Sequence, residues 1–311
     1  MNKQEIITSP ILYTGNKTRL IKKGLIDLFP KKINLFVDLF SGSLNVSMNT
    51  KANSYIINDI DHILHIYYKI FQTFNTKTII QHIEKQIKQY NLPTKHTPRK
   101  TTSKEEIEKY KKAYNYFRKI CNTEWNPLDI YTIMYFAYSQ QYRTNQDGKL
   151  NMPMGNNTFS LNHRINIENG CNFFKNKNIV IYQTDYAELF EKINLKKEDF
   201  IYLDPPYINT IAPYNKKYKW NLEKDKKLLH ICQTLHNKDI KFGLSNTLIS
   251  KGIKNQPLID LILKNNLQVY SPKNFKYSAN GKTDNTQQEV FVCNYEIQNP
   301  NTNFYKINNI A

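Results

Sequence analysis

The chain has 311 residues and a mass of 36.9 kDa, which suits one large domain or a core domain with an inserted lobe. Hydrophobic residues make up 40% and aromatic residues 13%, and this composition excludes a wholly disordered chain. The formal net charge of +18 predicts a polyanionic partner, with nucleic acid first and an acidic membrane surface second.

The cysteines are far apart and form no CxxC pair, so we expect buried free thiols and no zinc site or other metal site (Cys121, Cys171, Cys232 and Cys293). The first residues lack the apolar stretch of a secretion signal. No apolar run approaches the length of a membrane span. The sequence therefore predicts a soluble cytoplasmic protein that does not associate with a membrane.

The first predicted strand is the apolar run 33–39, which ends in an acid and a turn of small residues. A helix is expected over 44–50, and a second apolar strand over 54–60 ends in Asp59. Strand, turn, helix and strand in this order form a βαβ unit, which predicts a parallel sheet.

Later segments continue the same alternation. Strands are expected at 178–183, 199–203, 241–245 and 288–294, and helices at 225–235 and 258–264. Between 61 and 177 the pattern stops, and helices are expected near 63–74 and 104–120, with a mobile surface loop at 91–103. We therefore expect an α/β core at 1–61 and 178–300, a mostly helical inserted lobe at 62–177, and a C-terminal tail at 301–311.

The tetrapeptide Asp204-Pro205-Pro206-Tyr207 directly follows an apolar strand. In open α/β sheets, ligands bind at the carboxyl ends of strands. The prolines fix the backbone and remove two N–H donors, so the turn offers carboxylate and carbonyl acceptors beside an aromatic ring. This combination suits a planar group that carries an NH2. The alternative is a structural proline-rich turn.

A second candidate site is the turn from Asp38 through Phe40 to Gly42. Small residues there allow a ligand to approach the backbone, and a helix N-terminus follows. Asp59 ends the next strand, where a carboxylate commonly holds the ribose of a nucleotide-type cofactor. A structural turn would have the same pattern.

A third candidate is the polar segment 142–155 together with the preceding Tyr138, Ser139 and Gln141. Arginine, asparagine and glutamine side chains on such a turn suit contacts with bases and phosphates. An ordinary polar hairpin is the alternative.

Together, these segments resemble the Dam-like, alpha-class adenine-specific DNA methyltransferase family. The resemblance rests on five segments in order: 11–17, 38–42, 58–61, 143–153 and 204–207. Leu244-Ser245-Asn246 and the closing strand around Glu289 also fit the last segments of the family. It implies a Rossmann-like α/β methyltransferase core with a DNA-recognition lobe. The implied reaction transfers a methyl group from S-adenosylmethionine to N6 of an adenine flipped out of duplex DNA, which leaves S-adenosylhomocysteine.

The resemblance also implies residue roles. Tyr207 would stack on the base, while the Asp204 carboxylate and the Pro205 carbonyl accept the amino hydrogens and Pro206 completes the motif. Asp59 would hold the ribose, Lys17 would lie near the methionine end, and the other cofactor residues would be Tyr13, Thr14, Gly15, Asp38, Phe40, Gly42, Asp185 and Tyr186. DNA would be contacted by Tyr138, Ser139, Gln141, Arg143, Asn145 and Pro153, with Arg143 matching a guanine-reading arginine of the family.

The sequence departs from the family at three positions: the usual glycines are replaced by Leu44 and Asn16, and Leu12 replaces a basic residue of members that read GATC. The alternatives are methylation of cytosine N4, methylation of adenine in RNA, and a catalytically silent DNA-binding regulator. The expected partners are double-stranded DNA and a cognate restriction endonuclease, and the protein is expected to act as a monomer.

Overall fold

The structure is a computed structural model that describes residues 5–13, 16–98, 100–207, 220–250, 252–274, 277–279, 282–284, 288–298 and 303–308. The chain forms two compact units. The first, here called the sheet unit, comprises Met1–Ile6, Lys17–His62 and Lys177–Ala311. The second, here called the helical unit, comprises Ile7–Asn16 and Ile63–Asn176.

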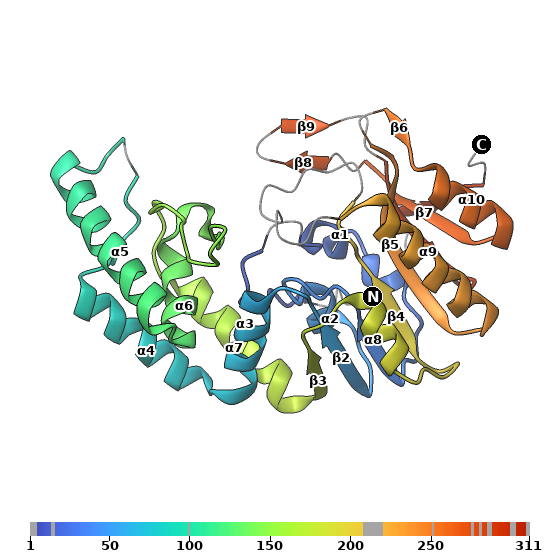
Figure 1. Ribbon diagram of the computed structural model, residues 1–311, viewed down its shortest axis with the longest axis horizontal. Helices are drawn as coiled ribbons and strands as arrows, with labels where there is room; N and C mark the ends of the chain where they lie inside the picture. The colour runs from blue at the N-terminus through green and yellow to red at the C-terminus, as the bar shows by residue number, and fades with distance from the viewer. Residues whose placement is uncertain are drawn as a thin grey trace. The chain divides into compact units, whose positions relative to one another are not determined.

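The described part of the sheet unit contains a nine-stranded sheet with the order β11-β7-β10-β5-β4-β1-β2-β3, in which β6 also pairs with β5 (Figure 1). The parallel strands are β1 (Leu35–Asp38), β2 (Ser54–Asn58), β3 (Asn178–Tyr182), β4 (Phe200–Leu203) and β5 (Lys241–Ser250). Antiparallel pairing adds β6 (Ile253–Lys254), β10 (Gln288–Cys293), β7 (Gln268–Pro272) and β11 (Phe304–Lys306). A separate pair consists of β8 (Tyr277–Ala279) and β9 (Lys282–Asp284).

The strand order reverses between β1 and β4. From β1 the chain continues to β2 on one side, whereas β4 pairs with β1 on the other side. Asp38 ends β1 and Asp204 directly follows β4, so both carboxylates lie at this switch point, where open α/β sheets bind ligands. The predicted α/β fold is confirmed, and so is parallel pairing among β1 to β5, where β5 extends beyond its predicted end to Ser250.

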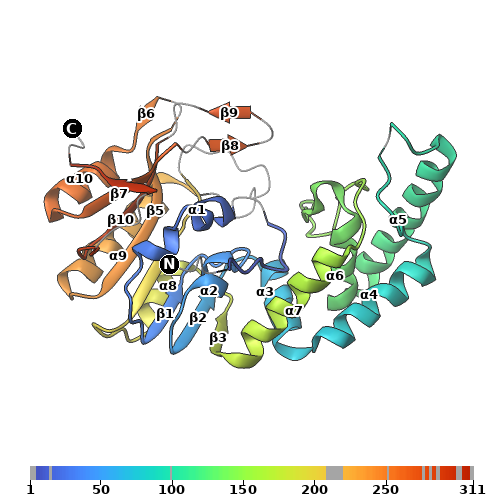
Figure 2. The ribbon, with the colours of Figure 1, turned by 180° about the vertical axis from the view of Figure 1, so that it is seen from behind.

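The two faces of the sheet bury different side chains. Aliphatic residues of the strands pack against α8 (Tyr186–Lys192), α9 (Leu222–Asn237) and α10 (Gln256–Asn265) (Figure 1). On the opposite face, Phe29 contacts the rings of Phe36, Phe200 and Phe291. A Cβ atom on Gly243 would lie 2.5 Å from the Phe291 ring, so this face requires glycine there. Short helices α1 (Thr18–Lys22) and α2 (Asn45–Asn49) are seen in Figure 2.

The helical unit is built from α3 (His62–Thr73), α4 (Thr76–Tyr90), α5 (Lys104–Glu124), α6 (Pro127–Ile133) and α7 (Leu161–Asn176). The predicted helices at 63–74 and 104–120 are confirmed as α3 and α5, whereas α4, α6 and α7 were not predicted. Side-chain caps explain where helices begin: Ser103 accepts a hydrogen bond from Glu106 N, and Asn75 accepts one from Thr78 N.

The segment 91–103 is irregular, but the prediction of a surface loop is wrong for three of its residues, since Leu92, Pro93 and Thr97 are buried. Leu92 and Thr97 are 2% and 1% exposed. The Thr97 N–H donates to the Asn156 carbonyl at 2.9 Å, and the Thr158 hydroxyl donates to the Pro93 carbonyl at 2.5 Å. The segment is therefore tied to the chain near 156–158.

Two segments differ from the expected domain limits. Residues 7–16, expected in the core, group with the helical unit, because the Pro10 carbonyl accepts the Tyr131 hydroxyl and the Pro10 ring packs where Gly170 has no side chain. Residues 301–311, expected as a tail, contribute β11, whose Phe304 is buried.

All four cysteines are buried free thiols, as predicted. Among the residues the structure describes, no group of three or more His, Cys, Asp or Glu side chains could hold a metal ion. Within the same residues, we find no helix with the length and hydrophobicity that a membrane crossing requires.

Candidate functional site

Asp38, at the carboxyl end of β1, is a buried carboxylate with one oxygen left for a ligand. Its Oδ2 accepts the Ser47 hydroxyl at 2.5 Å, and its Oδ1 is buried with no hydrogen-bond partner among the described residues. Burial raises the pKa of Asp38 to about 7; the Ser47 hydrogen bond opposes the shift, and the charges of Asp204 and Asp59 add to it. An unpaired buried acceptor is costly, so this oxygen is suited to a ligand that carries a donor.

Asp59, just beyond β2, lies beside the turn that follows β1. Its Oδ2 accepts the backbone N–H of Gly42 at 3.0 Å, and its Oδ1 accepts that of Asp61 at 3.0 Å. Gly42 has a φ of 47°, a left-handed conformation that favours glycine. The side chain is only partly buried, and burial is the main cause that raises the pKa of Asp59.

Asn58, not among the predicted site residues, ties three strand ends together. Its Nδ2 donates to the carbonyls of Leu39 and Thr184 at 3.1 Å each, and its Oδ1 accepts the Thr184 N–H at 3.1 Å. These bonds hold the ends of β1, β2 and β3 in fixed relation. A buried polar residue that ends an apolar run is the signal by which sequence reasoning could have found it.

Asp204, just beyond β4, belongs to a closed polar cluster. Lys17 Nζ lies 2.9 Å from Asp204 Oδ1, 3.2 Å from Glu289 Oε1 and 2.7 Å from the Tyr207 hydroxyl oxygen. The Tyr207 hydroxyl in turn donates to Glu289 Oε1 at 2.8 Å. Lys17, expected near the methionine end of the cofactor, is thus a direct partner of Asp204. Glu289 was not among the predicted site residues.

Burial and charge act in opposite directions in this cluster. Burial raises the pKa of Asp204 to about 6, Lys17 lowers it, and Glu289 raises it further. For Lys17, burial alone would lower the pKa, but the carboxylates of Asp204 and Glu289 raise it overall, so the lysine stays charged. At neutral pH, Asp204 is therefore mainly ionised and able to accept hydrogen bonds.

The tetrapeptide prolines and three aromatic rings complete the sheet unit's candidate site. Pro205 is buried and Pro206 partly buried. The rings of Phe40 and Tyr186 lie 5.3 Å apart, and both contact Trp220, at 5.7 and 5.4 Å. Trp220 had no sequence signal.

The neighbouring Asp185 caps α8 by accepting the Ala187 N–H at 3.0 Å. The Tyr186 hydroxyl donates to the Lys224 carbonyl at 2.6 Å, which orients the ring within the aromatic cluster. Asp185 therefore has a structural role whether or not it also contacts a ligand.

In the helical unit, the predicted DNA-contacting residues begin with an exposed turn. Tyr138 is 64% exposed, and its N–H donates to the carbonyl of Pro153, which is also exposed. Ser139 has a left-handed φ of 58°, and Gln141 is partly buried.

Arg143 and Asn145 shape the hairpin that follows. The Arg143 guanidinium donates to the side chain and to the carbonyl of Asn151, at 2.9 and 3.1 Å. Asn145 Oδ1 accepts the N–H groups of Asp147 and Lys149 at 3.0 and 2.9 Å. Asn145 is therefore committed to the turn, while Arg143 remains exposed.

One side of α5 holds the second arm of this hairpin. The Asn122 side chain bonds both the N–H and the carbonyl of Leu150, at 2.8 and 3.0 Å. One and two turns earlier, Arg118 and Tyr114 donate to the Met152 carbonyl. The i, i+4, i+8 spacing places the three side chains on one side of the helix.

Tyr13, predicted to bind the cofactor, belongs to the helical unit, and its ring stacks on Tyr142 with centroids 6.4 Å apart. Thr14 and Gly15 lie outside the described residues.

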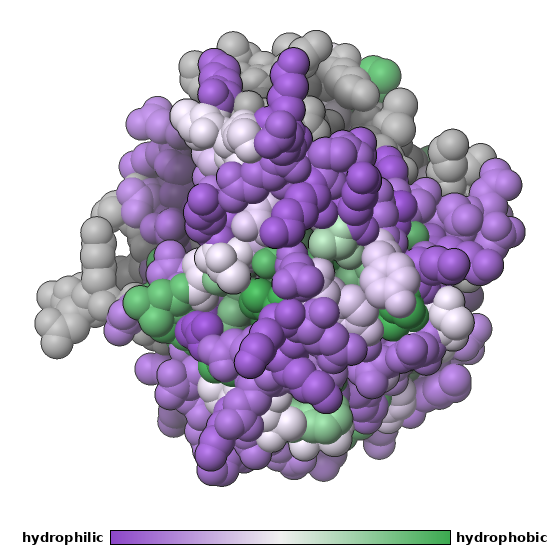
Figure 3. Space-filling model, turned by 90° about the vertical axis from the view of Figure 1, so that its left-hand side faces the viewer, coloured by the Kyte–Doolittle hydropathy of each residue, from purple (hydrophilic) through white to green (hydrophobic). Residues whose placement is uncertain are grey.

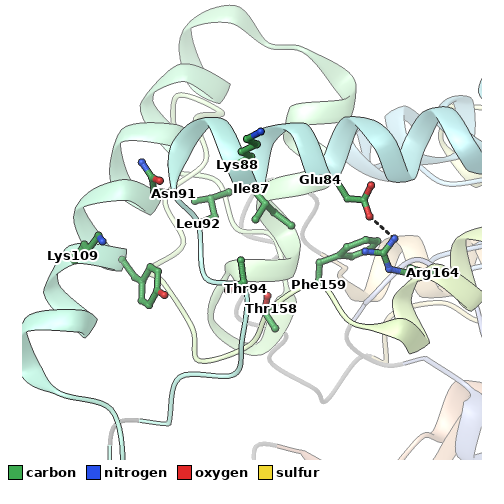
Figure 4. Close-up of a pocket in the computed structure, with 11 residues that line it drawn as sticks. Glu84, Ile87, Lys88, Asn91, Leu92, Thr94, Lys109, Thr158, Phe159 and Arg164 are labelled. Atoms are coloured by element: carbon green, nitrogen blue, oxygen red, sulfur yellow. Dashed lines mark ion pairs between the residues drawn. The ribbon is translucent and has the colours of Figure 1, made fainter.

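The helical unit also contains an open cavity of about 480 Å³ that includes none of the predicted site residues (Figure 4). Arg164 on its wall pairs with Glu84 at 2.7 Å and lies over the Phe159 ring. The face of the molecule drawn in Figure 3 is largely hydrophilic, with small, separated apolar areas. This face therefore offers polar side chains rather than a broad apolar surface.

A family model and several known proteins are similar to this chain, and all of them are methyltransferases. A family model described as "D12 class N6 adenine-specific DNA methyltransferase" matches residues 13–286. Modification methylase StsI of Streptococcus sanguinis is 36% identical over 302 residues, which are 95% of this chain and 44% of that protein. Type II methyltransferase M.FokI of Planomicrobium okeanokoites is 32% identical over 93% of this chain and 43% of its own.

Modification methylase LlaI of Lactococcus lactis subsp. lactis is 27% identical over 92% of this chain and 43% of its own. The chain therefore spans less than half the length of these relatives. Among solved structures, the rRNA methyltransferase aviRa from Streptomyces viridochromogenes is 10% identical, with a TM-score of 0.35 over 89% of this chain and 83% of that one. So low a score says nothing further about the fold.

Proposed function

Since the chain belongs to the D12 class N6 adenine-specific DNA methyltransferase family, we propose that it transfers a methyl group from S-adenosylmethionine to N6 of adenine in duplex DNA. The observation that carries this proposal is the pairing of Asp204 with Lys17 at 2.9 Å, directly after β4 and beside the strand that ends in Asp38. A carboxylate held ionised at a switch point can accept hydrogen bonds from an amino group.

We assign the cofactor to the carboxyl ends of β1, β2 and β3. When bound, S-adenosylmethionine supplies the methyl group on its sulfonium. The unpartnered Oδ1 of Asp38 supports the fit, because it needs a donor. Asp59 would accept the ribose hydroxyls, and Gly42 leaves room for close approach. Phe40, Asp185 and Tyr186 would border the adenine end. Tyr13, Thr14 and Gly15 stay predicted cofactor-binding residues.

The target adenine must leave the helix, because its amino group is paired and enclosed within the base stack. Tyr207 would then stack on the base. The Asp204 carboxylate and the Pro205 carbonyl would accept the two amino hydrogens, and Pro206 would fix the turn. These contacts align the nitrogen lone pair for direct transfer and need no covalent intermediate on the protein.

The helical unit would position the DNA. Tyr138, Ser139, Gln141, Arg143, Asn145 and Pro153 are the proposed contact residues. Arg143 is the candidate for reading a base edge, since an exposed guanidinium can donate two hydrogen bonds to guanine. The positive net charge supports binding to phosphate.

Transfer of tritium from labelled S-adenosylmethionine to duplex DNA, followed by nucleoside analysis, tests the proposal. We expect label in N6-methyladenine, and Asp204→Ala should abolish it while DNA affinity stays largely intact. Label in N4-methylcytosine, preferential labelling of RNA, or DNA binding without transfer would overturn the proposal in favour of each alternative in turn.

We further propose a restriction-modification setting, because two of the relatives are named modification methylases. A cognate endonuclease would then be blocked by the methylated site. To test this setting, DNA from cells that express the protein is treated with that endonuclease, and we expect the DNA to be protected from cleavage. We expect monomeric action, which light scattering of the protein bound to a short duplex would measure.

A further inference from the structure

We propose that Glu289 is a positioning residue for methyl transfer, because it anchors Lys17 and Tyr207 and so fixes the two groups, Asp204 and the tyrosine ring, that would receive the target base. This inference rests on the proposed function and adds a residue to it. Glu289 lies on β10, far along the chain from the tetrapeptide.

The geometry is a closed set of contacts around one carboxylate oxygen. Glu289 Oε1 accepts the Tyr207 hydroxyl at 2.8 Å and the Lys17 ammonium at 3.2 Å. The ammonium also contacts the Tyr207 oxygen at 2.7 Å and Asp204 Oδ1 at 2.9 Å. Removing the Glu289 carboxylate would therefore remove one hydrogen-bond partner from both the Tyr207 hydroxyl and the Lys17 ammonium.

Glu289 is 5% exposed and Lys17 is 9% exposed, so this cluster is shielded from water. A buried charge is stable only when it is paired and hydrogen-bonded. Lys17 is the cation that pairs both carboxylates, and Glu289 keeps it in place between them. A tyrosine whose hydroxyl is held in this way keeps its ring orientation before a base arrives, which lowers the cost of aligning the base.

The charge of Glu289 also acts on Asp204, and this effect distinguishes a positioning role from a purely structural contact. The charge of Glu289 raises the pKa of Asp204, whereas Lys17 lowers it. Asp204 also interacts with the charges or dipoles of Tyr202 and Asp38. Glu289→Gln keeps an acceptor oxygen but removes the charge, so Asp204 would then lose its proton at a lower pH.

Single-turnover transfer to duplex DNA, measured from pH 5 to pH 8, tests the inference. In the wild type, the rate should rise with pH through about 6, where Asp204 ionises. Glu289→Gln should move this rise to lower pH by roughly half to one unit. Glu289→Ala, which frees Lys17 and Tyr207, should lower the plateau rate by on the order of 10- to 100-fold, with DNA affinity unchanged.

Asp199→Asn is the matched control, because Asp199 is a buried acid at the opposite end of β4 whose partners are backbone groups and Asn34. It should change stability without moving the pH profile. If Glu289→Ala does not fold, the glutamine variant alone decides.

A Glu289→Gln profile that coincides with the wild type, or a rate loss matched by an equal loss of DNA affinity, would overturn the positioning role. A wild-type protein with no transfer would instead contradict the proposed function. In that case, carbon-13 NMR titration of the Asp204 carboxyl still tests the anchor: its midpoint should be lower in Glu289→Gln, and an unchanged midpoint would reject the role.

Discussion

Asp199 and Asp204 stand at the two ends of the same strand, β4, and have opposite surroundings. Asp199 accepts the N–H groups of Leu35 and Lys196, at 3.1 and 2.8 Å, and so ties the loop before β4 to β1. Asp204 has the Lys17 ammonium as its partner, and no backbone N–H of the described residues donates to it. One acid stabilises the fold, and the other is the proposed catalytic carboxylate.

The two acids should therefore respond differently to removal. Asp199→Ala should lower the free energy of unfolding by about 1–3 kcal/mol, because it leaves buried N–H groups without acceptors. Asp204→Ala should remove methyl transfer and change stability less, since burial already disfavours its charge. Urea unfolding and tritium transfer measure both. An Asp204→Ala protein with most of its turnover would make the catalytic assignment wrong.

Asp38 should make the stability of the ligand-free protein depend on pH. Its folded-state pKa is raised from 3.8 to about 7, mainly by burial, so its favourable contribution is complete below pH 3.8 and is lost as the pH rises through 7. Asp38→Asn should thus gain stability relative to the wild type between pH 5 and pH 8, by on the order of 1–4 kcal/mol. Urea unfolding of both proteins at pH 5 and pH 8 measures this gain. The same difference in unfolding free energy between variant and wild type at the two pH values would contradict the prediction.

Much of the core could be predicted because its strands are short apolar runs that end in acids. This pattern identified β1, β2 and β4, and the rule that ligands bind at carboxyl ends then singled out Asp38 and Asp204. The sequence carried less information on α7, which has polar residues around it and Gly170 inside it. That glycine is explained only by tertiary packing, since the Pro10 ring fills its place.

The cluster around Asp204 could not be predicted from local patterns. Lys17 and Glu289 are 272 positions apart and meet only because β10 inserts beside β5 in antiparallel direction. No spacing rule connects residues brought together in this way. Asn58 was likewise missed as a site residue, although its contacts to Leu39 and Thr184 set the strand ends that carry the predicted carboxylates.

Leu44 should show a cost of backbone strain. It is the N-cap residue of α2 and has φ 65°, a left-handed conformation that is unfavourable for a side chain, and it is 1% exposed. Both Leu44→Ala and Leu44→Gly lose the buried side chain, at about 2–5 kcal/mol. Leu44→Gly should be the more stable of the two by about 1 kcal/mol, because only glycine relieves the strain. Thermal unfolding with the alanine variant more stable would reject this explanation.

Asn122 should matter for DNA recognition although it lies on α5. Its side chain satisfies both backbone groups of Leu150, so Asn122→Ala should loosen the hairpin arm and lower stability by about 1–3 kcal/mol. We expect weaker discrimination among DNA sequences with an unchanged pH profile of transfer. Thr123→Ala, next to it and exposed, is the matched control. Equal effects of the two variants on sequence preference would contradict a role of the Asn122–Leu150 hydrogen bonds in DNA recognition.

Arg143 should supply sequence discrimination, and Lys149 should supply general affinity. Both are exposed on the same hairpin, but only Arg143 is oriented, by two hydrogen bonds to Asn151. Arg143→Ala should reduce discrimination at one base pair by roughly 1–3 kcal/mol. Lys149→Ala should weaken binding to all sequences and reduce the dependence of affinity on salt. Titrations against a panel of single-base variants at two salt concentrations measure both. If Arg143→Ala weakens every sequence equally, the arginine contacts phosphate and another residue reads the base.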